Sequence, residues 1–153
     1  IQLVATYPLW YDEVENGIQL ISATGGLTFD FKFDQTIQFG TASPAGFITN
    51  TGDIPAPMRV VMRGASMTNP RISLDGQPDY IQINKSISPD EQVIITTDYG
   101  NKMVKINDAS AMRYLEEGST FFNIPVGTSK FKITTDSGEP QVYVYWRNWY
   151  AGV

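Results

Sequence analysis

Hydrophobic and polar residues alternate in short runs along most of the chain. In Leu27–Asp34, three phenylalanines at positions 29, 31 and 33 share one side of an extended backbone, and charged residues at 30, 32 and 34 share the other. Side chains of a strand alternate between the two faces of a sheet, whereas helical spacing would scatter these rings around a helix. This segment is therefore predicted to be a strand with one buried and one solvated face.

Similar runs recur along the chain and are separated by turn residues. The other expected strands are Ala5–Tyr11, Ile18–Ser22, Ile37–Phe39, Arg59–Arg63, Arg71–Leu74, Tyr80–Asn84, Val93–Thr97, Lys102–Ile106, Thr120–Ile124, Lys130–Thr134 and Gln141–Arg147. Tight connections are expected at Asn16-Gly17, Gly25-Gly26, Asp75-Gly76, Tyr99-Gly100-Asn101 and Asp136-Ser137-Gly138, because glycine and asparagine tolerate the positive φ that hairpin turns require. Many short strands at this spacing predict an all-β sandwich or barrel.

Two segments depart from the strand pattern. Asn107–Leu115 is predicted to be a short helix, with Asp108 as its N-cap and Gly118 just beyond its end. Ser43–Pro57 is rich in proline and glycine, which predicts either a long ordered loop or an edge strand that its prolines keep from pairing. A loop of this length in a compact domain is more often a functional or contact surface than an idle connection.

Composition narrows the class of protein. The chain has 153 residues of even composition, with 42% hydrophobic and 18% charged residues, so residues 1–153 are expected to form a single globular domain. The sequence contains no apolar run long enough to cross a bilayer, so membrane insertion is not expected. The first residue is Ile1 and not methionine, from which we infer that a preceding segment was removed or omitted from a longer polypeptide.

The residue types that are missing argue against most enzymes. There is no cysteine and no histidine, which excludes Ser-His-Asp and Cys-His catalysis and the usual zinc hydrolases. The formal net charge of −5 and the absence of a Lys/Arg cluster make nucleic acid an unfavourable partner. No cofactor is expected.

Paired carboxylates are the remaining catalytic possibility. The candidates are Asp12/Glu13/Glu15, Asp30/Asp34, Asp90/Glu91 and Glu116/Glu117. A glycosidase needs two carboxyl groups across a cleft, one of them with a raised pKa. These pairs lie in segments that are predicted to be solvated strand faces and turns, so no catalytic residue is assigned. The lysine between Asp30 and Asp34 would place a cation among the ligands of a metal ion, so no metal site is assigned either.

Aromatic residues gather near both ends of the chain. Trp10-Tyr11 forms one group, and the other contains Tyr143, Tyr145, Trp146, Trp149 and Tyr150. Such side chains suit a core, a protein interface or a platform for sugar stacking, and all three remain open. In the last long strand, Val144 and Trp146 are expected on one face and the two tyrosines on the other, so this strand is predicted to be central in its sheet or covered by another protein.

Asn69-Pro70-Arg71 also occurs at a strand end in galectins, the sugar-binding β-sandwich proteins. Sugar recognition there relies on a histidine two positions earlier, where this chain has Met67. The tripeptide therefore supports a sugar site only weakly.

Several segments, read in order, resemble the C-terminal domain of the siphophage distal tail protein family, the siphovirus-type tail component. The matching segments are Tyr7-Pro8-Leu9-Trp10-Tyr11, Asn50-Thr51-Gly52-Asp53 with the prolines and strand that follow to Gly64, Asn69–Ile72, Glu91–Gly100, Gly118–Gly127 and Val144–Val153. Thr128-Ser129 departs from the family, which often has asparagine after the glycine. The resemblance implies a galectin-like, jelly-roll antiparallel β-sandwich, joined in the full protein to an N-terminal domain that builds a hexameric ring at the end of the tail tube.

The leading hypothesis is a non-enzymatic phage tail-tip hub module, located in the virion and assembled in the bacterial host cytoplasm. The resemblance implies that its partners are the receptor-binding protein, the tail tube and the tail-associated hub protein. The chain by itself is predicted to be monomeric. The predicted contact surface comprises Trp10, Tyr11, Pro44, Phe47, Pro55, Pro57, Trp149 and Tyr150. The main alternative is a carbohydrate-binding module for a host cell-wall saccharide, which would need an exposed groove with a solvent-facing Trp or Tyr beside convergent polar groups. A glycosidase that uses carboxylates is the third hypothesis for the function.

Overall fold

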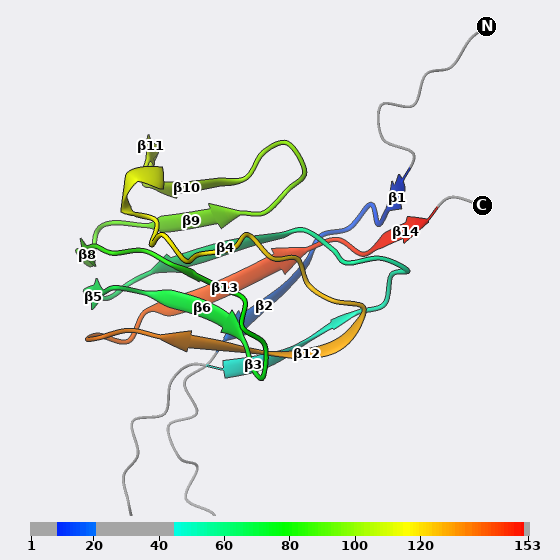
Figure 1. The fold of residues 1–153 in the computed structure, drawn as a ribbon, viewed down its shortest axis with the longest axis horizontal. Coiled ribbons are helices and arrows are strands. Elements are labelled where there is room, and N and C mark those ends of the chain that lie inside the picture. The colour runs from blue at the N-terminus through cyan, green and yellow to red at the C-terminus, as the bar shows by residue number, and fades with distance from the viewer. Residues whose placement is uncertain (1–8, 21–44, 152–153) are drawn as a thin grey trace, which may run out of the picture.

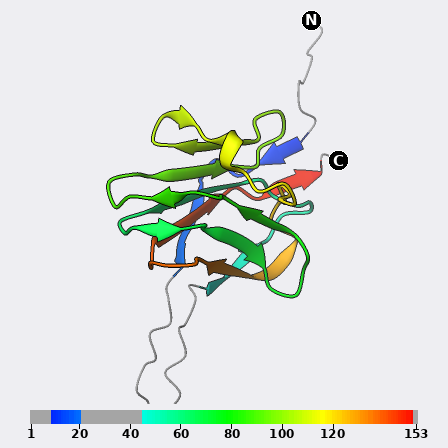
Figure 2. The same ribbon diagram turned by 60° about the vertical axis from the view of Figure 1, so that its left-hand side comes forward.

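The fold is an antiparallel β-sandwich. The computed structural model describes residues 9–20 and 45–151, in which two sheets stack face to face (Figures 1 and 2). The larger sheet has the strand order β11-β10-β9-β4-β13-β2, formed by Ala109–Ser110, Met103–Ile106, Val93–Thr96, Met58–Arg63, Gln141–Trp146 and Asn16–Leu20. The smaller sheet has the order β3-β12-β6-β7, formed by Ala45–Asn50, Gly127–Thr134, Arg71–Leu74 and Tyr80–Gln82.

Two small ribbons complete the described structure. β5 (Met67–Thr68) pairs with β8 (Ser86–Ile87) at one end of the sandwich. β1 (Leu9–Tyr11) pairs with β14 (Trp149–Ala151) at the opposite end, where the first and last described strands lie side by side (Figure 1). The predicted all-β class and sandwich architecture are therefore confirmed.

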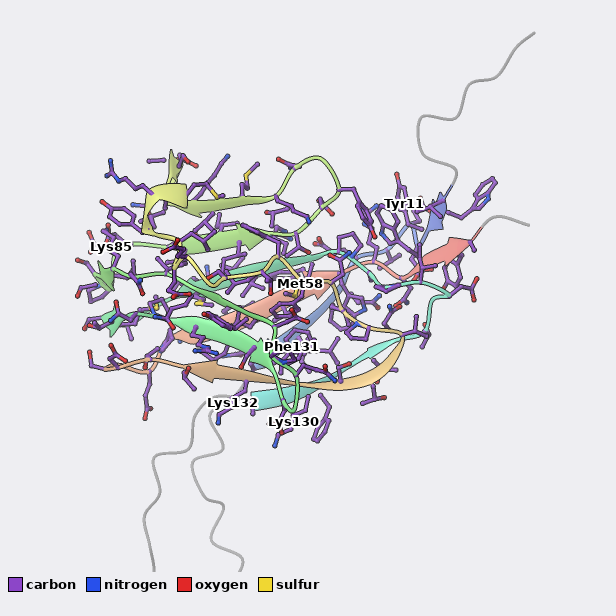
Figure 3. The ribbon with its side chains drawn as sticks, viewed as in Figure 1. Tyr11, Met58, Lys85, Lys130, Phe131 and Lys132 are labelled. Atoms are coloured by element: carbon purple, nitrogen blue, oxygen red, sulfur yellow. The ribbon has the colours of Figure 1, made fainter. Side chains whose placement is uncertain are left out.

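Alternation along the strands builds the core between the sheets. On β12, Phe131 and Ile133 are fully buried, whereas Lys130 and Lys132 lie on the outer side of the sheet (Figure 3). The same rule applies to the larger sheet, where Val60, Met62, Ile95, Val104, Val142 and Val144 are all fully buried. Removing this apolar surface from water is the main term that stabilises the sandwich.

The last long strand is central, as its two-sided pattern predicts. β13 pairs with β4 on one edge and with β2 on the other. Val142 and Val144 face the core, while Tyr143 and Tyr145 are half-buried on the outer face of the sheet. Tyr145 lies opposite Gly17, where an added Cβ would come within 2.9 Å of the tyrosine Cδ1 atom. Asn16-Gly17, predicted to be a turn, is instead part of β2, because this glycine makes room for a neighbouring ring.

The predicted helix over Asn107–Leu115 is wrong. Ala109–Ser110 folds back on Lys105–Ile106 as a hairpin, and Asn107 at the bend has a φ of 53°. Only Met112–Tyr114 is helical, as a single 3-10 turn without a side-chain cap. Tertiary contacts override the local helical pattern, because Leu115 bridges to Ile83 in place of packing along a helix face.

Two other predictions need correction at the level of elements. Thr120–Ile124 is not a strand, since only Ile124 pairs, through an isolated bridge to Ala56. The described part of Ser43–Pro57, residues 45–57, contains an edge strand and an ordered loop, but the strand pairs with β12 and its pairing is not blocked by proline. Ala45–Asn50 is the edge strand β3, and the segment after it is an ordered connection fixed by bridges at Ile54 and Ala56.

The remaining long strands lie where the alternation predicts them, and the turns at Asp75-Gly76, Tyr99-Gly100-Asn101 and Asp136-Ser137-Gly138 connect them. The predictions for Leu27–Asp34, Ile37–Phe39 and Gly25-Gly26 lie outside the described residues.

Candidate aromatic cleft and contact surface

The β1–β14 ribbon sorts four aromatic residues onto two faces. Trp10 lies opposite Tyr150, and Tyr11 lies opposite Trp149. Because side chains directly opposite one another share a face, the ribbon presents one aromatic pair on each side. Trp10 and Tyr11 are 73% and 57% exposed, while their two partners are half-buried. The ribbon is therefore the most exposed aromatic feature of the described structure.

An open cleft begins at the face of the ribbon that carries Trp149. The Trp149 ring lies between two tyrosine rings, with centroids 6.0 Å from Tyr11 and 5.6 Å from Tyr99. Tyr99 is 45% exposed and belongs to the β9–β10 turn, in which Asn101 donates its backbone N–H to the Asp98 carbonyl at 3.0 Å. The cleft has a volume of about 450 Å³. It is lined by Tyr11, Glu15, Pro57, Met58, Arg59, Asp98, Tyr99, Asn101, Tyr145, Trp146, Arg147 and Trp149.

Charged groups of both signs line the cleft beside these rings. The Arg59 guanidinium donates to the Glu15 carboxylate at 2.7 Å and lies 4.4 Å from the centre of the Tyr145 ring. Arg147 lies 5.5 Å from the centre of the Tyr11 ring. Stacking on a ring restrains the orientation of a guanidinium and leaves its edge available to hydrogen-bond acceptors. The cleft thus combines aromatic faces with positioned donors and acceptors.

Buried amides fix the backbone around the cleft. Asn148 donates its side-chain N–H to the Asp12 carboxylate at 2.7 Å and accepts the Thr51 N–H at 3.2 Å. The Asp53 N–H donates to the Trp149 carbonyl at 2.9 Å. An added Cβ at Gly52 would collide with this carbonyl and would lie 2.8 Å from the Trp149 nitrogen, so only glycine allows the approach.

Two further polar groups lie in this region. The Asp12 carboxylate, hydrogen-bonded to Tyr150, raises the pKa of the tyrosine hydroxyl, and partial burial adds to the effect. The Trp146 indole N–H is buried and has no hydrogen-bond acceptor within residues 9–20 and 45–151.

The structure separates the predicted contact residues into different environments. Trp10, Tyr11 and Pro55 are exposed, and Phe47 is 66% exposed on the edge strand β3. Pro57 is mostly buried, because the chain turns inward there to begin β4, and only a small part of it is accessible, in the wall of the cleft. Pro44 lies outside the described residues. Three members of the set line the cleft: Tyr11, Pro57 and Trp149.

Sequence reasoning missed the other side of the cleft. Tyr99 was read only as part of a turn, and Arg59 only as part of a strand. An aromatic residue at the tip of a hairpin is a usable signal for exposure. In contrast, the pairing of Arg59 with Glu15 depends on strand order, which alternation does not specify.

The galectin-like tripeptide does not form a second polar site. The Asn69 side chain donates to the Asp136 carboxylate at 2.6 Å, and the Arg71 guanidinium stacks 3.6 Å from the centre of the Tyr80 ring. Both side chains therefore make internal contacts at the start of β6.

The acidic pairs of the sequence take part in structural contacts. The Glu91 carboxylate accepts from Lys85 at 2.8 Å and from the Ser88 N–H at 2.8 Å, and these bonds hold its pKa below the ordinary value of 4.5. Glu116 accepts from the Tyr80 hydroxyl at 2.7 Å, which raises the pKa of that tyrosine. The pair Asp30/Asp34 lies outside the described residues.

Across the described ranges, no three Asp or Glu side chains are close enough together to hold a metal ion. None of the helices in the same ranges has the length and apolar character needed to span a membrane.

Comparison with known proteins identifies relatives of the chain. A family model described as the siphovirus-type tail component, C-terminal domain, matches residues 51–150. No curated protein matches the chain. A solved structure of the SPP1 Dit (gp 19.1) protein, described as a paradigm of the hub adsorption apparatus in phages that infect Gram-positive bacteria, superposes with a TM-score of 0.64 at 14% identity. The match covers 94% of this chain and 49% of that one, so the chain spans about half the length of the solved protein.

Proposed function

The chain belongs to the siphovirus-type tail component family, whose C-terminal domain it matches, and from this premise we propose that it is a non-enzymatic module of the phage tail tip that presents protein-contact surfaces during host adsorption. The family match over residues 51–150 carries the proposal. The similarity to the Dit structure supports the fold of such a module, and the exposed aromatic ribbon supports a contact role.

The surface chemistry supports contact through side chains at two places. Trp10 and Phe47 are large apolar residues, each more than half exposed, on the β1–β14 ribbon and on the edge strand β3. Exposed aromatic residues of this kind are enriched at protein interfaces and often dominate their binding energy. The partners that fit the proposal are the receptor-binding protein, the tail tube and the tail-associated hub protein, with the full-length protein acting as a hexamer.

The carboxylates support a non-enzymatic role. A glycosidase acid requires a raised pKa, whereas Glu91 is held in its charged form by Lys85 and by the Ser88 N–H. Glu15 is bound to Arg59 and Glu116 to Tyr80, so these groups serve structural contacts. The sequence also lacks the histidine and cysteine that most hydrolytic mechanisms use.

Immunogold electron microscopy tests the location. Antibodies against this chain should label one end of the tail in particles released from the parent bacterium, where assembly in the cytoplasm precedes release. Labelling of heads, or of material that is not attached to tails, would overturn the proposal.

The contact residues are tested in the same particles. Trp10→Ala and Phe47→Ala should reduce adsorption to the host or remove a neighbouring tail protein, because each deletes a large exposed anchor. Val126→Ala is the matched control, since Val126 is 51% exposed but lies outside the predicted contact set. Equal adsorption by all three variants would contradict the assignment of these residues.

A further inference from the structure

The cleft beside the β1–β14 ribbon has the size and the lining of a small-ligand site. Its rings are accessible, with Tyr11 57% and Tyr99 45% exposed on either side of Trp149. Exposed rings arranged around a concavity provide apolar faces against which a flat ligand can stack. A volume of about 450 Å³ lies within the usual range for small-molecule sites, roughly 300–1,000 Å³.

The polar groups of the cleft suit hydroxyl groups. Arg147 supplies donors and Asp98 supplies acceptors. Arg59 and Glu15 are bound to each other through one N–H and one carboxylate oxygen, and their remaining N–H groups and lone pairs add further donors and acceptors. A hydroxyl group both donates and accepts, so neighbouring sugar hydroxyls can satisfy both kinds of group at once. The two positive and two negative side chains balance, which removes any preference for a strongly charged ligand.

The position of the cleft in the sheet disfavours peptide binding by strand addition. β4 and β13 form its floor, and both are already paired along both edges. An added peptide strand would need a free sheet edge for its main-chain hydrogen bonds, and none is available on these two strands. On the floor of the cleft, recognition therefore comes from side chains.

The cleft is also held in shape before any ligand binds. The hydrogen bonds of Asn148 to Asp12 and Thr51, and the approach of Gly52 to Trp149, fix the backbone that carries the aromatic wall. A site that is already ordered loses less conformational entropy when it binds a ligand.

We propose that this cleft binds a neutral oligosaccharide of two or three sugar units, with the apolar faces of the sugar rings stacked on Tyr99, Trp149 and Tyr11. The arginines and carboxylates hydrogen-bond the hydroxyl groups along its edge. This binding differs from the proposed contacts of Trp10 and Phe47, which do not line the cleft, whereas Tyr11 and Trp149 belong both to the cleft and to the predicted contact set.

Titration with neutral trisaccharides tests the proposal. Cellotriose, maltotriose and triacetylchitotriose are added to the full chain up to about 10 mM, and tryptophan fluorescence and protein NMR shifts are recorded. At least one of them should bind with a dissociation constant on the order of 1 mM. The changes should concentrate on Trp146, Trp149 and Tyr99, which line the cleft.

Variants separate specific binding from other effects. Tyr99→Ala should weaken the binding about tenfold or more, which corresponds to the loss of one stacking face, whereas Tyr99→Phe should bind nearly as wild type. Phe47→Ala is the matched control, because it removes an exposed ring from the other sheet that does not line the cleft. Melting temperatures of all variants establish that each one is folded.

Three results would overturn the proposal: no binding of any of the three sugars, equal binding by Tyr99→Ala, or saturation of the cleft by a short polyproline peptide without competition from sugar. The last result would assign the cleft to an extended polypeptide instead. None of these outcomes affects the antibody labelling that tests the tail-tip role.

Discussion

At the scale of single residues, side chains that are similar in type have different roles because of what lies next to them. Trp10 is mostly exposed, whereas Trp149 is half-buried with the rings of Tyr11 and Tyr99 beside it. Phe47 is exposed on an edge strand, while Phe131 is fully buried between the sheets. Residue type therefore predicts that an aromatic side chain contributes to packing or to binding. The residues around it decide whether it packs in the core, stacks on another ring or contacts a partner.

Glu91 provides a prediction at this scale. Its pKa is lowered by the hydrogen bonds from Lys85 and the Ser88 N–H, so it stabilises the fold at pH values above its ordinary pKa of 4.5. This contribution is lost as the pH falls through the lowered pKa of the folded state, because the carboxyl group then becomes protonated. Glu91→Gln should melt at a lower temperature than wild type at pH 7, and the difference should shrink below pH 4.5.

Thermal unfolding followed by circular dichroism across this pH range provides the measurement. Glu117→Gln is the matched control, because Glu117 is exposed on the surface and should show little change. A difference for Glu91→Gln that stays constant down to strongly acidic pH would rule out the ionic origin of its effect.

At the scale of elements, the ordered connection after β3 depends on one buried amide. The Asn50 side chain donates to the carbonyls of Ile54 at 2.9 Å and Ile124 at 3.1 Å. Its oxygen accepts the Gly52 N–H at 2.9 Å, which forms an Asx turn. Asn50 thereby joins the edge strand to the segment that leads into β4.

Asn50→Ala should destabilise the protein by about 2–4 kcal/mol, because it leaves buried backbone groups without partners. Urea unfolding measures the change. Thr49→Ala is the adjacent control on the exposed face of the same strand and should cost less than about 1 kcal/mol. If the two variants lost equal stability, the buried amide would not be what holds this connection.

The failed helix over residues 107–115 belongs to the same scale. Its apolar residues occur at helical spacing, but Ala111 and Leu115 are placed by pairing and packing with neighbouring strands. The Ala111 N–H donates to the Val104 carbonyl at 2.8 Å, a contact between residues that no helix would bring together. In short segments such as this one, the spacing of apolar residues is a weak predictor of secondary structure.

At the scale of the whole molecule, the described ranges place their apolar side chains in the space between two sheets. Among residues 9–20 and 45–151, the exposed aromatic side chains lie at the β1–β14 end and on one sheet edge, and not across a broad continuous face. This distribution favours a separate, monomeric sandwich. That residues 1–153 form a single domain remains a prediction.

Light scattering and calorimetry check this prediction together. The chain should have a molar mass near 17.0 kDa in solution and should unfold in one cooperative transition. A stable hexamer would overturn the monomer prediction, and two separate transitions would overturn the single domain.

The sequence by itself determined the all-β class, the positions of most long strands and the residues that face the core. It did so because side chains of a strand alternate strictly between the two faces of the sheet. A strand with one buried face therefore has an apolar residue at every second position, as at Phe131 and Ile133. Composition also shows that residues 1–153 contain no histidine or cysteine, so these residues supply no Ser-His-Asp or Cys-His catalytic group.

Only the tertiary structure decided the aromatic cleft. The alternation of hydrophobic and polar residues predicts which face of a sheet a side chain occupies, but it does not predict which strand is the neighbour in that sheet. Strand order places Glu15 beside Arg59, and the packing of the β9–β10 turn against the terminal ribbon places Tyr99 beside Trp149. These contacts join residues far apart in the chain, so they arise from the closing of the sandwich and not from any local pattern.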